Sequence, residues 1–299
     1  MSYDFHEQGV PEIQEATCAG CGQCVRICPD EVLAMDGDKP RAGAGLLLGC
    51  IACGQCMAVC PTASIGVSGR GMTPDDRIAL PPAGQQATAD QLEALMTARR
   101  SLRRFTTKDV PRELLDRIVR IAATAPMGIP PSDVGVVVFE GRRQVQSFAE
   151  DACRCFSRAA AFFHPVTLAL MRPFVGKAKY EVFRDFIRPL LRFLPKMQGQ
   201  GRDLFTYDAP AAIVFHHGPA GDASDSMIAA TYAMLAAESL GLGSCMLGTT
   251  VALTQDKRLK AKYGIPPENR VGVTLIVGYP AVKFQYAVRR RLASVRYVN

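Results

Sequence analysis

Eight of the eleven cysteines lie between Cys18 and Cys60, in two runs that share one internal spacing. The first run, CAGCGQCVRICP, begins at Cys18, and the second, CIACGQCMAVCP, begins at Cys50. Both follow the pattern C-x2-C-x2-C-x3-C-P, in which three thiolates bind one iron–sulfur cube and the fourth binds the neighbouring cube. The spacing therefore predicts two [4Fe-4S] clusters, one held by Cys18, Cys21, Cys24 and Cys60 and the other by Cys50, Cys53, Cys56 and Cys28.

The residues around these cysteines also suit a cluster. Gly22 and Gly54 permit a positive φ and a close backbone approach, so that amide N–H groups can point at the sulfurs. Pro29 and Pro61 turn the chain away after the fourth cysteine of each run. A pair of zinc sites is the alternative interpretation, but zinc ligands usually come as separated pairs of cysteines. Two complete runs of four cysteines favour the clusters.

The composition excludes several classes of protein. With 299 residues, of which 48% are hydrophobic, the chain can form one large and one small folded domain. Its net charge of +7 comes from 35 basic residues interleaved with 28 acidic ones, which does not indicate a nucleic-acid partner. No apolar run approaches the ~20 residues of a membrane-spanning helix, and the first ten residues lack a secretory signal. We therefore expect a cytoplasmic protein with reduced cysteines and no transmembrane segment.

Changes in composition along the chain indicate where its domains end. Residues 67–90 are rich in Gly, Pro and small polar residues and lack an apolar period, as linkers do. We predict a cluster-binding domain over residues 1–68, a linker over 69–88 and a second domain over 89–299.

The second domain combines helical and strand patterns. Apolar residues at helical spacing predict three helices, and short β-rich runs predict three strands. The helices are expected around 92–96, 114–122 and 225–240, and the strands over 134–139, 212–216 and 271–277. This combination predicts an α+β fold. The remaining cysteines, Cys153, Cys155 and Cys245, are expected to be small buried hydrophobes.

Both domains resemble known families. Residues 15–66 resemble the bacterial two-cluster ferredoxins, which implies carriers of single electrons at low potential. Four segments of the second domain resemble the nitroreductase family of FMN enzymes, namely RRSLRRF, ATAPMGIPPSDVGVVVF, AAESLGLGSCMLG, and LIVGYP with a terminal RRRL. The resemblance implies a nitroreductase-like α+β homodimer with FMN in the subunit interface.

The second resemblance also implies which residues contact FMN. Arginines and a serine would grip the phosphate and ribityl chain, a strip from the partner subunit would lie against the flavin, and a third segment would run along the isoalloxazine ring. In that order, these residues are Arg99, Arg100, Ser101, Arg103, Arg289 and Arg291, then Pro126, Met127 and Gly128, and then Leu247, Gly248 and Thr249. The N–H of Gly248 is expected to point at N5, where a backbone donor tunes the reduced flavin without titrating.

The sequence departs from this family at two places. Where many members carry Asn-x-Gln-Pro, this chain has Pro130, Ser132 and Asp133, so the family's side-chain contacts from that loop are not assigned. The family's flavin-contacting asparagine aligns near Arg202. If Arg202 reaches the pyrimidine edge, its charge would stabilise the anionic reduced flavin and raise its potential.

Together these features predict an oxidoreductase that passes electrons from two clusters to FMN and on to an electron-poor organic acceptor, such as a nitro compound, quinone, activated alkene or halide. A low-potential donor such as ferredoxin is expected. The alternatives are an electron-transfer module that serves a partner protein and a flavin reductase fed by NAD(P)H. No catalytic side chain is assigned. The segment 156–205 has three open interpretations, namely core packing, a lid over the substrate pocket and a contact with a membrane surface.

Overall fold

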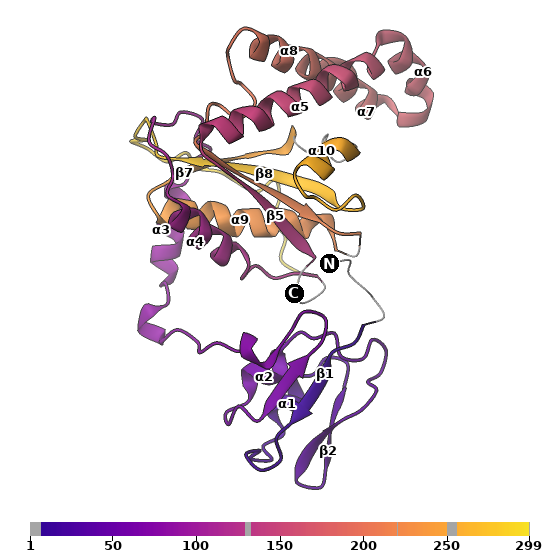
Figure 1. Cartoon of the computed structure of the whole chain (residues 1–299), viewed down its shortest axis with the longest axis vertical. Coiled ribbons are helices and arrows are strands. Elements are labelled where there is room, and N and C mark those ends of the chain that lie inside the picture. Colours follow the sequence, from indigo (N-terminus) through magenta and orange to yellow (C-terminus); the bar gives the residue numbers. More distant parts are fainter. Residues whose placement is uncertain (1–6, 129–132, 220, 250–255, 299) are drawn as a thin grey trace.

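Two units joined by an extended connection make up the chain (Figure 1). The computed structural model describes residues 7–128, 133–219, 221–249 and 256–298. The smaller unit holds the two cysteine runs, and the larger unit holds a four-stranded sheet between layers of helices. In these ranges, no helix combines the length and the apolar character needed to cross a membrane.

The smaller unit contains the same motif twice. Helices α1 (Gln23–Ile27) and α2 (Gln55–Val59) begin after Gly22 and Gly54, whose φ angles are +65° and +70°. The positive φ predicted at both glycines is therefore confirmed. Each helix leads into a strand that pairs antiparallel with another, β2 with β3 and β4 with β1. These strands are β1 (Val10–Ile13), β2 (Leu33–Asp36), β3 (Lys39–Ala42) and β4 (Ile65–Ser68).

The connection between the units is exposed. After β4 it contains two short 3-10 turns, η1 (Pro74–Asp76) and η2 (Ala83–Gln85), before helix α3 (Ala89–Ala98) begins. The Arg77 guanidinium donates to the carbonyl oxygens of Ala63 (3.0 Å) and Ile65 (3.3 Å). The first part of the connection therefore lies against the smaller unit.

The sheet of the larger unit has the strand order β5-β6-β8-β7 and is antiparallel throughout. All residues of β6 are buried, because helices cover both of its faces. Val214 belongs to the core on one face, and Ile213 and Phe215 belong to the core on the other. The predicted α+β class is confirmed. The four strands are β5 (Val134–Glu140), β6 (Ala211–His217), β7 (Gly243–Leu247) and β8 (Arg270–Gly278).

Helices α4 (Arg112–Ala122) and α9 (Ala223–Ser239) cover one face of the sheet, and α5 (Arg142–Phe162) covers the other (Figure 1). Helix α4 buries Leu115 and Ile118 at helical spacing. Helix α9 presents a row of buried alanines, whose small side chains let the helix lie close to the sheet. The three predicted helices and three predicted strands are confirmed in these elements, while α5 and β7 were not predicted.

Helix α3 buries none of its residues, although its apolar side chains recur at helical spacing. Leu92 is 43% exposed and Met96 is 49% exposed. The apolar spacing predicted the helix correctly, but this chain alone does not cover its apolar side.

The larger unit extends beyond its sheet at one end (Figure 1). Here α5 is followed by α6 (Pro165–Val175), α7 (Lys177–Val182), a π-helical turn η3 (Phe183–Ile187) and α8 (Arg188–Gly199). Helix α8 packs back on α5, so the excursion is anchored at both of its ends. A short helix, α10 (Lys257–Lys262), precedes β8.

Candidate functional site: two cysteine quartets and the edge of the sheet

Four cysteines of the smaller unit line one hollow. The first three precede or begin α1, and the fourth follows α2. The hollow holds about 330 Å³ of empty space, counted with its opening to solvent. The cysteines are Cys18, Cys21, Cys24 and Cys60.

The other four cysteines line a second hollow of about 410 Å³, again counted with its opening. They are Cys28, Cys50, Cys53 and Cys56. The structure therefore brings the fourth cysteine of each run together with the first three of the other run, as the spacing predicts.

Each quartet surrounds a space and does not converge on a point. Among the residues that the structure describes, no three Cys, His, Asp or Glu side chains are placed to hold a single metal ion. An iron–sulfur cube puts iron and sulfide between its four thiolates and so needs room inside the quartet. The donor set of both quartets, arranged around a hollow, fits such a cube.

Backbone N–H groups support the two exchanged cysteines at equivalent positions of the repeat. The N–H of Val32 donates to Sγ of Cys28 at 3.3 Å, and the N–H of Ser64 donates to Sγ of Cys60 at 3.3 Å. Such donors stabilise negative charge on a thiolate and tune the potential of a cluster that it binds.

The protonation of the thiols depends on their surroundings. Burial raises the pKa of Cys24 and Cys50, and it raises the pKa of Cys56 to about 12. For Cys60, burial also acts upward, but hydrogen bonds from Thr62 and from backbone N–H groups bring its pKa below the ordinary value. Since only thiolates bind metal, the buried thiols need the positive charge of iron to ionise.

One carboxylate fixes the loop that leads into the second run. Asp30 accepts hydrogen bonds from the N–H groups of Leu47 (3.0 Å), Leu48 (3.1 Å) and Gly49 (2.7 Å). Burial acts to raise its pKa, but these hydrogen bonds lower it, so the carboxylate is ionised at neutral pH. Asp30 was not predicted as a functional residue, and it stands where the second copy of the repeat has Thr62.

In the larger unit, the basic segment 99–105 runs along the edge strand β7. Ser101 forms a parallel bridge with Ser244, and the N–H of Leu102 donates to the Ser244 carbonyl at 2.9 Å. Leu102 is 3% exposed, whereas Ser101 and Arg103 are exposed. Because side chains alternate along an extended chain, Ser101 and Arg103 share the outer side of this segment.

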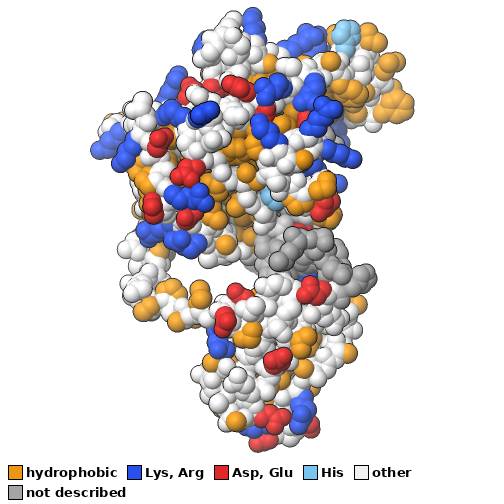
Figure 2. Space-filling model, viewed as in Figure 1, with side chains coloured by type: hydrophobic (Ala, Val, Ile, Leu, Met, Phe, Trp, Pro, Cys, Tyr) orange, Lys and Arg blue, Asp and Glu red, His pale blue; other side chains and the backbone are white. Residues whose placement is uncertain are grey.

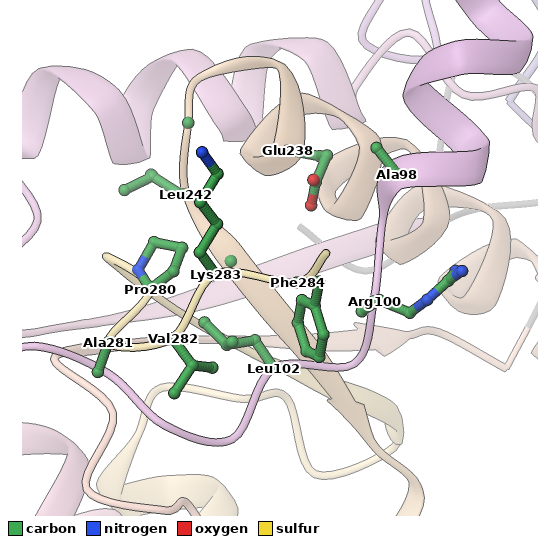
Figure 3. A pocket seen from close by; sticks show the side chains of 12 residues that line it. Ala98, Arg100, Leu102, Glu238, Leu242, Pro280, Ala281, Val282, Lys283 and Phe284 are labelled. Carbon is green, nitrogen blue, oxygen red and sulfur yellow. The ribbon is translucent and has the colours of Figure 1, made fainter. Parts of the chain in front are cut away.

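Arg100 and Leu102 both line another space, a pocket of about 530 Å³, although their side chains point in different directions (Figure 3). Glu238 of α9 and residues 280–284 also line this pocket. Burial raises the pKa of Glu238, while the positive charges of Arg99 and Arg100 partly offset that rise. Ser101 and Arg103 are not among the residues that line this pocket.

The segment assigned to the isoalloxazine ring lies at the far end of β7. Leu247 is buried, and Gly248 is exposed with no atom within 4 Å of the place where a Cβ would stand. Gly248 lies four residues beyond Ser244, which is about 13 Å along a strand. Ser101 and Gly248 thus lie at different points along the edge strand β7.

The segment assigned to the partner-facing strip follows α4 and is tied to α9. The N–H of Gly128 donates to the carboxylate of Asp225, at 3.2 Å and 3.3 Å to its two oxygens. Asp225 is 3% exposed, and Met127 packs on the same core as α9. Asp225 was not predicted as a functional residue. The signal that could have identified it is an acidic side chain in the first turn of a helix that was predicted to be buried.

The departures from the family pattern are partly visible. Pro130 and Ser132 lie outside the described residues, while Asp133 accepts a hydrogen bond from the N–H of Gly221 at 2.7 Å. Arg202 follows α8 and is exposed, and its guanidinium lies 3.9 Å from Sδ of Met197. Thr249 is half-buried, and Pro126 is exposed.

The two C-terminal arginines lie in an extended tail. Residues 281–298 are exposed throughout, and the N–H of Ala281 donates to the Arg104 carbonyl at 3.0 Å. Across the described ranges, no hydrogen bond or ion pair joins Arg289 or Arg291 to another residue. The single chain thus does not bring them to Ser101.

Two models of protein families match separate parts of the chain. Models of protein families match residues 96–279 to the nitroreductase family and residues 17–64 to a 4Fe-4S dicluster domain. A nitroreductase with bound FMN from Bacteroides fragilis is 18% identical and covers 70% of this chain and 98% of its own, with a TM-score of 0.51. A second one, from Desulfitobacterium hafniense and also with bound FMN, is 20% identical over 69% of this chain and 97% of its own, with a TM-score of 0.48. The first likeness supports the fold. A comparison with curated proteins gave no match.

Proposed function

This chain belongs to the nitroreductase family, whose model matches well over half of its residues, and from that premise we propose that it is an iron–sulfur flavoprotein oxidoreductase. Its N-terminal dicluster domain would receive electrons, and its FMN domain would deliver them to a small electron-poor organic acceptor. When bound, the clusters carry single electrons and FMN exchanges one or two, so a one-electron donor can serve a two-electron acceptor. The observation that carries this proposal is that one chain combines two thiol-lined hollows with a nitroreductase-family sheet.

The cysteine quartets are the proposed cluster ligands. Cys18, Cys21, Cys24 and Cys60 would hold one cluster, and Cys28, Cys50, Cys53 and Cys56 the other. The N–H groups that reach Cys28 and Cys60 would stabilise the ligating sulfurs. The carboxylate of Asp30 would keep the loop before Cys50 in place.

The outer side of the segment along β7 is the proposed phosphate end of the FMN site. Arg103 and Ser101 supply a guanidinium and a hydroxyl, which bind phosphate oxygens well. The open backbone at Gly248 would face the ring at the other end, and the Pro126–Gly128 strip would border it. Arg100, which lines the Glu238 pocket, has no place in this arrangement. Arg202, which is exposed after α8, would bring its charge to the pyrimidine edge of FMN.

We also propose that the working molecule is a homodimer. Helix α3 exposes Leu92 and Met96, and the tail exposes apolar side chains at every second position. Phe284, Tyr286 and Val288 are 52%, 87% and 68% exposed in the single chain. If a partner subunit covered the tail, Arg289 and Arg291 would reach the phosphate of the FMN that the partner binds. Among the described residues of the single chain, these two arginines are unpaired.

Charge favours contact between the two units. Residues 1–88 contain ten acidic and five basic residues, whereas residues 89–299 contain 18 acidic and 30 basic ones. Opposite net charges draw surfaces together, and salt screens that attraction. The acidic unit would therefore deliver electrons to the basic unit more slowly as ionic strength rises.

An anaerobic screen of donors and acceptors tests the proposed function. We expect reduced ferredoxin to reduce the bound flavin, and a nitroaromatic, quinone, activated alkene or organohalide to reoxidise it with multiple turnovers. Flavin absorbance reports both steps. Reoxidation by a partner protein alone would support the electron-transfer module instead, and reduction by NAD(P)H alone would support the flavin reductase.

A further inference from the structure

A group of exposed apolar side chains covers the end of the larger unit that is farthest from the cysteine runs. Figure 2 shows them as a continuous apolar area at the upper right, over α6 and α7. Phe174 is 88% exposed and Leu170 is 68% exposed, values far above those of core residues. We call this area the α6–α7 patch, and its members are Phe162, Val166, Leu170, Phe174, Val182 and Phe186.

The patch is a fixed surface of the fold. Val166, Leu170 and Phe174 recur at every fourth residue of α6, which puts them on one side of that helix. Leu168, between them in sequence, is 2% exposed and anchors the opposite side in the protein. Phe163 and Phe183 lie in contact with ring centroids 5.5 Å apart, and this contact joins the end of α5 to η3. The apolar side chains are therefore held in place together.

The segment that carries most of the patch is rich in basic residues. Residues 165–199 contain seven Lys and Arg but only two acidic residues, and one of these, Asp185, is paired with Arg184 at 2.6 Å. Within the described part of the chain, Lys177, Lys179 and Lys196 take part in no ion pair. The segment therefore presents several uncompensated positive charges beside exposed phenylalanine and leucine.

We propose that the α6–α7 patch binds the surface of a membrane that contains anionic lipid. Apolar side chains on one side of a helix enter the boundary between headgroups and acyl chains, and flanking lysines attract lipid phosphates. Helix α6 has eleven residues, about 16 Å, so it lies on the bilayer and does not cross it.

The charge of the patch argues against a second copy of this chain as its occupant. A twofold interface with the patch at its axis would place this surface of both subunits face to face. Each copy would then bring the same positive segment against the other, which costs free energy. Anionic lipid offers the complementary charge. This inference concerns where the protein binds, and its test does not depend on the proposed redox function.

Co-sedimentation of the full-length holoprotein with lipid vesicles tests the inference. We expect binding to vesicles of phosphatidylcholine mixed with phosphatidylglycerol, and much weaker binding to phosphatidylcholine alone. Lys177→Gln with Lys179→Gln should lower binding by about 25-fold, roughly fivefold for each lysine. Leu170→Asp with Phe174→Asp should lower it at least as much. The matched control is Leu80→Asp, because Leu80 in the connection is 86% exposed.

Three results would overturn the inference. One is the absence of binding to the mixed vesicles at low salt. Another is an equal loss of binding in the Leu80→Asp control, and the third is unchanged binding in the Leu170→Asp, Phe174→Asp variant. Light scattering on the same variants would show a lower mass if the patch instead joins two subunits. All of these positions are exposed, so circular dichroism should show that each variant stays folded.

Discussion

A Cys60→Ala variant will retain about half of the iron of the native protein, and adding Cys18→Ala will remove no more, because both thiols belong to one cluster. Adding Cys53→Ala to Cys60→Ala will instead remove nearly all of the iron. Cys53 and Cys60 belong to the same sequence run, but they line different hollows. Iron content per chain, with FMN content measured in parallel, distinguishes the two double variants.

The reverse pattern would contradict the assignment of ligands. If Cys60→Ala with Cys53→Ala kept half of the iron and Cys60→Ala with Cys18→Ala lost all of it, each run would hold its own cluster. Cys245→Ala is the matched control, since Cys245 is buried in β7 and lies in neither quartet. Its iron content should equal that of the native protein.

Arg103→Ala will weaken FMN binding by about ten- to a hundredfold, the cost of about 1.5–3 kcal/mol for a lost hydrogen bond to a charged group. Ser101→Ala should weaken it less, because a hydroxyl bonds phosphate less strongly than a guanidinium does. Arg99→Ala combined with Arg291→Ala should also lower the affinity if the partner's tail completes the site. Fluorescence titration of the apoprotein with FMN measures each dissociation constant.

Arg100→Ala provides the matched control for that series. It removes an arginine of the same segment, but Arg100 lines the Glu238 pocket, which Ser101 and Arg103 do not line. Its FMN affinity should stay within about twofold of the native value. An equal loss in the Arg100→Ala and Arg103→Ala variants would show that side-chain alternation does not define the phosphate end.

The grouping of the cysteines could be predicted because it depends on short-range spacing. Gly22 and Gly54 precede their helices with positive φ. The first three thiols of each run then line the same hollow. The fourth position follows from the geometry of the cube. Asp30 escaped the prediction because its partners lie 17 to 19 residues away, in a loop without a motif of its own.

For the proposed FMN site, the sequence could predict which segments take part but not how their side chains are arranged. The basic run was identified by residue type. Which of its side chains are exposed depends on the burial of Leu102, which lies so close to Gly243 that a Cβ on that glycine would clash with it. The contact between Gly128 and Asp225 joins residues 97 positions apart. Such long-range packing carries no local sequence signal.

Among the elements of the larger unit that were not predicted, β7 and α5 were missed for physical reasons of their own. Strand β7 has only five residues and follows a helix directly, so its sequence also suits a helix end and a turn. Helix α5 intersperses its buried Phe148 and Phe156 with charged residues, which hides its apolar side from a local inspection of the sequence. The excursion after α5 was recognised as apolar and basic, but only the structure shows which of its side chains are exposed.

Anaerobic stopped-flow mixing with reduced ferredoxin tests most directly whether electrons enter through the clusters. We predict that cluster absorbance will bleach before flavin absorbance. In a Cys18→Ala, Cys53→Ala variant that keeps its FMN, we predict that ferredoxin will no longer reduce the flavin. Flavin reduction that precedes cluster reduction, or that proceeds at an unchanged rate in this variant, would contradict electron entry through the clusters.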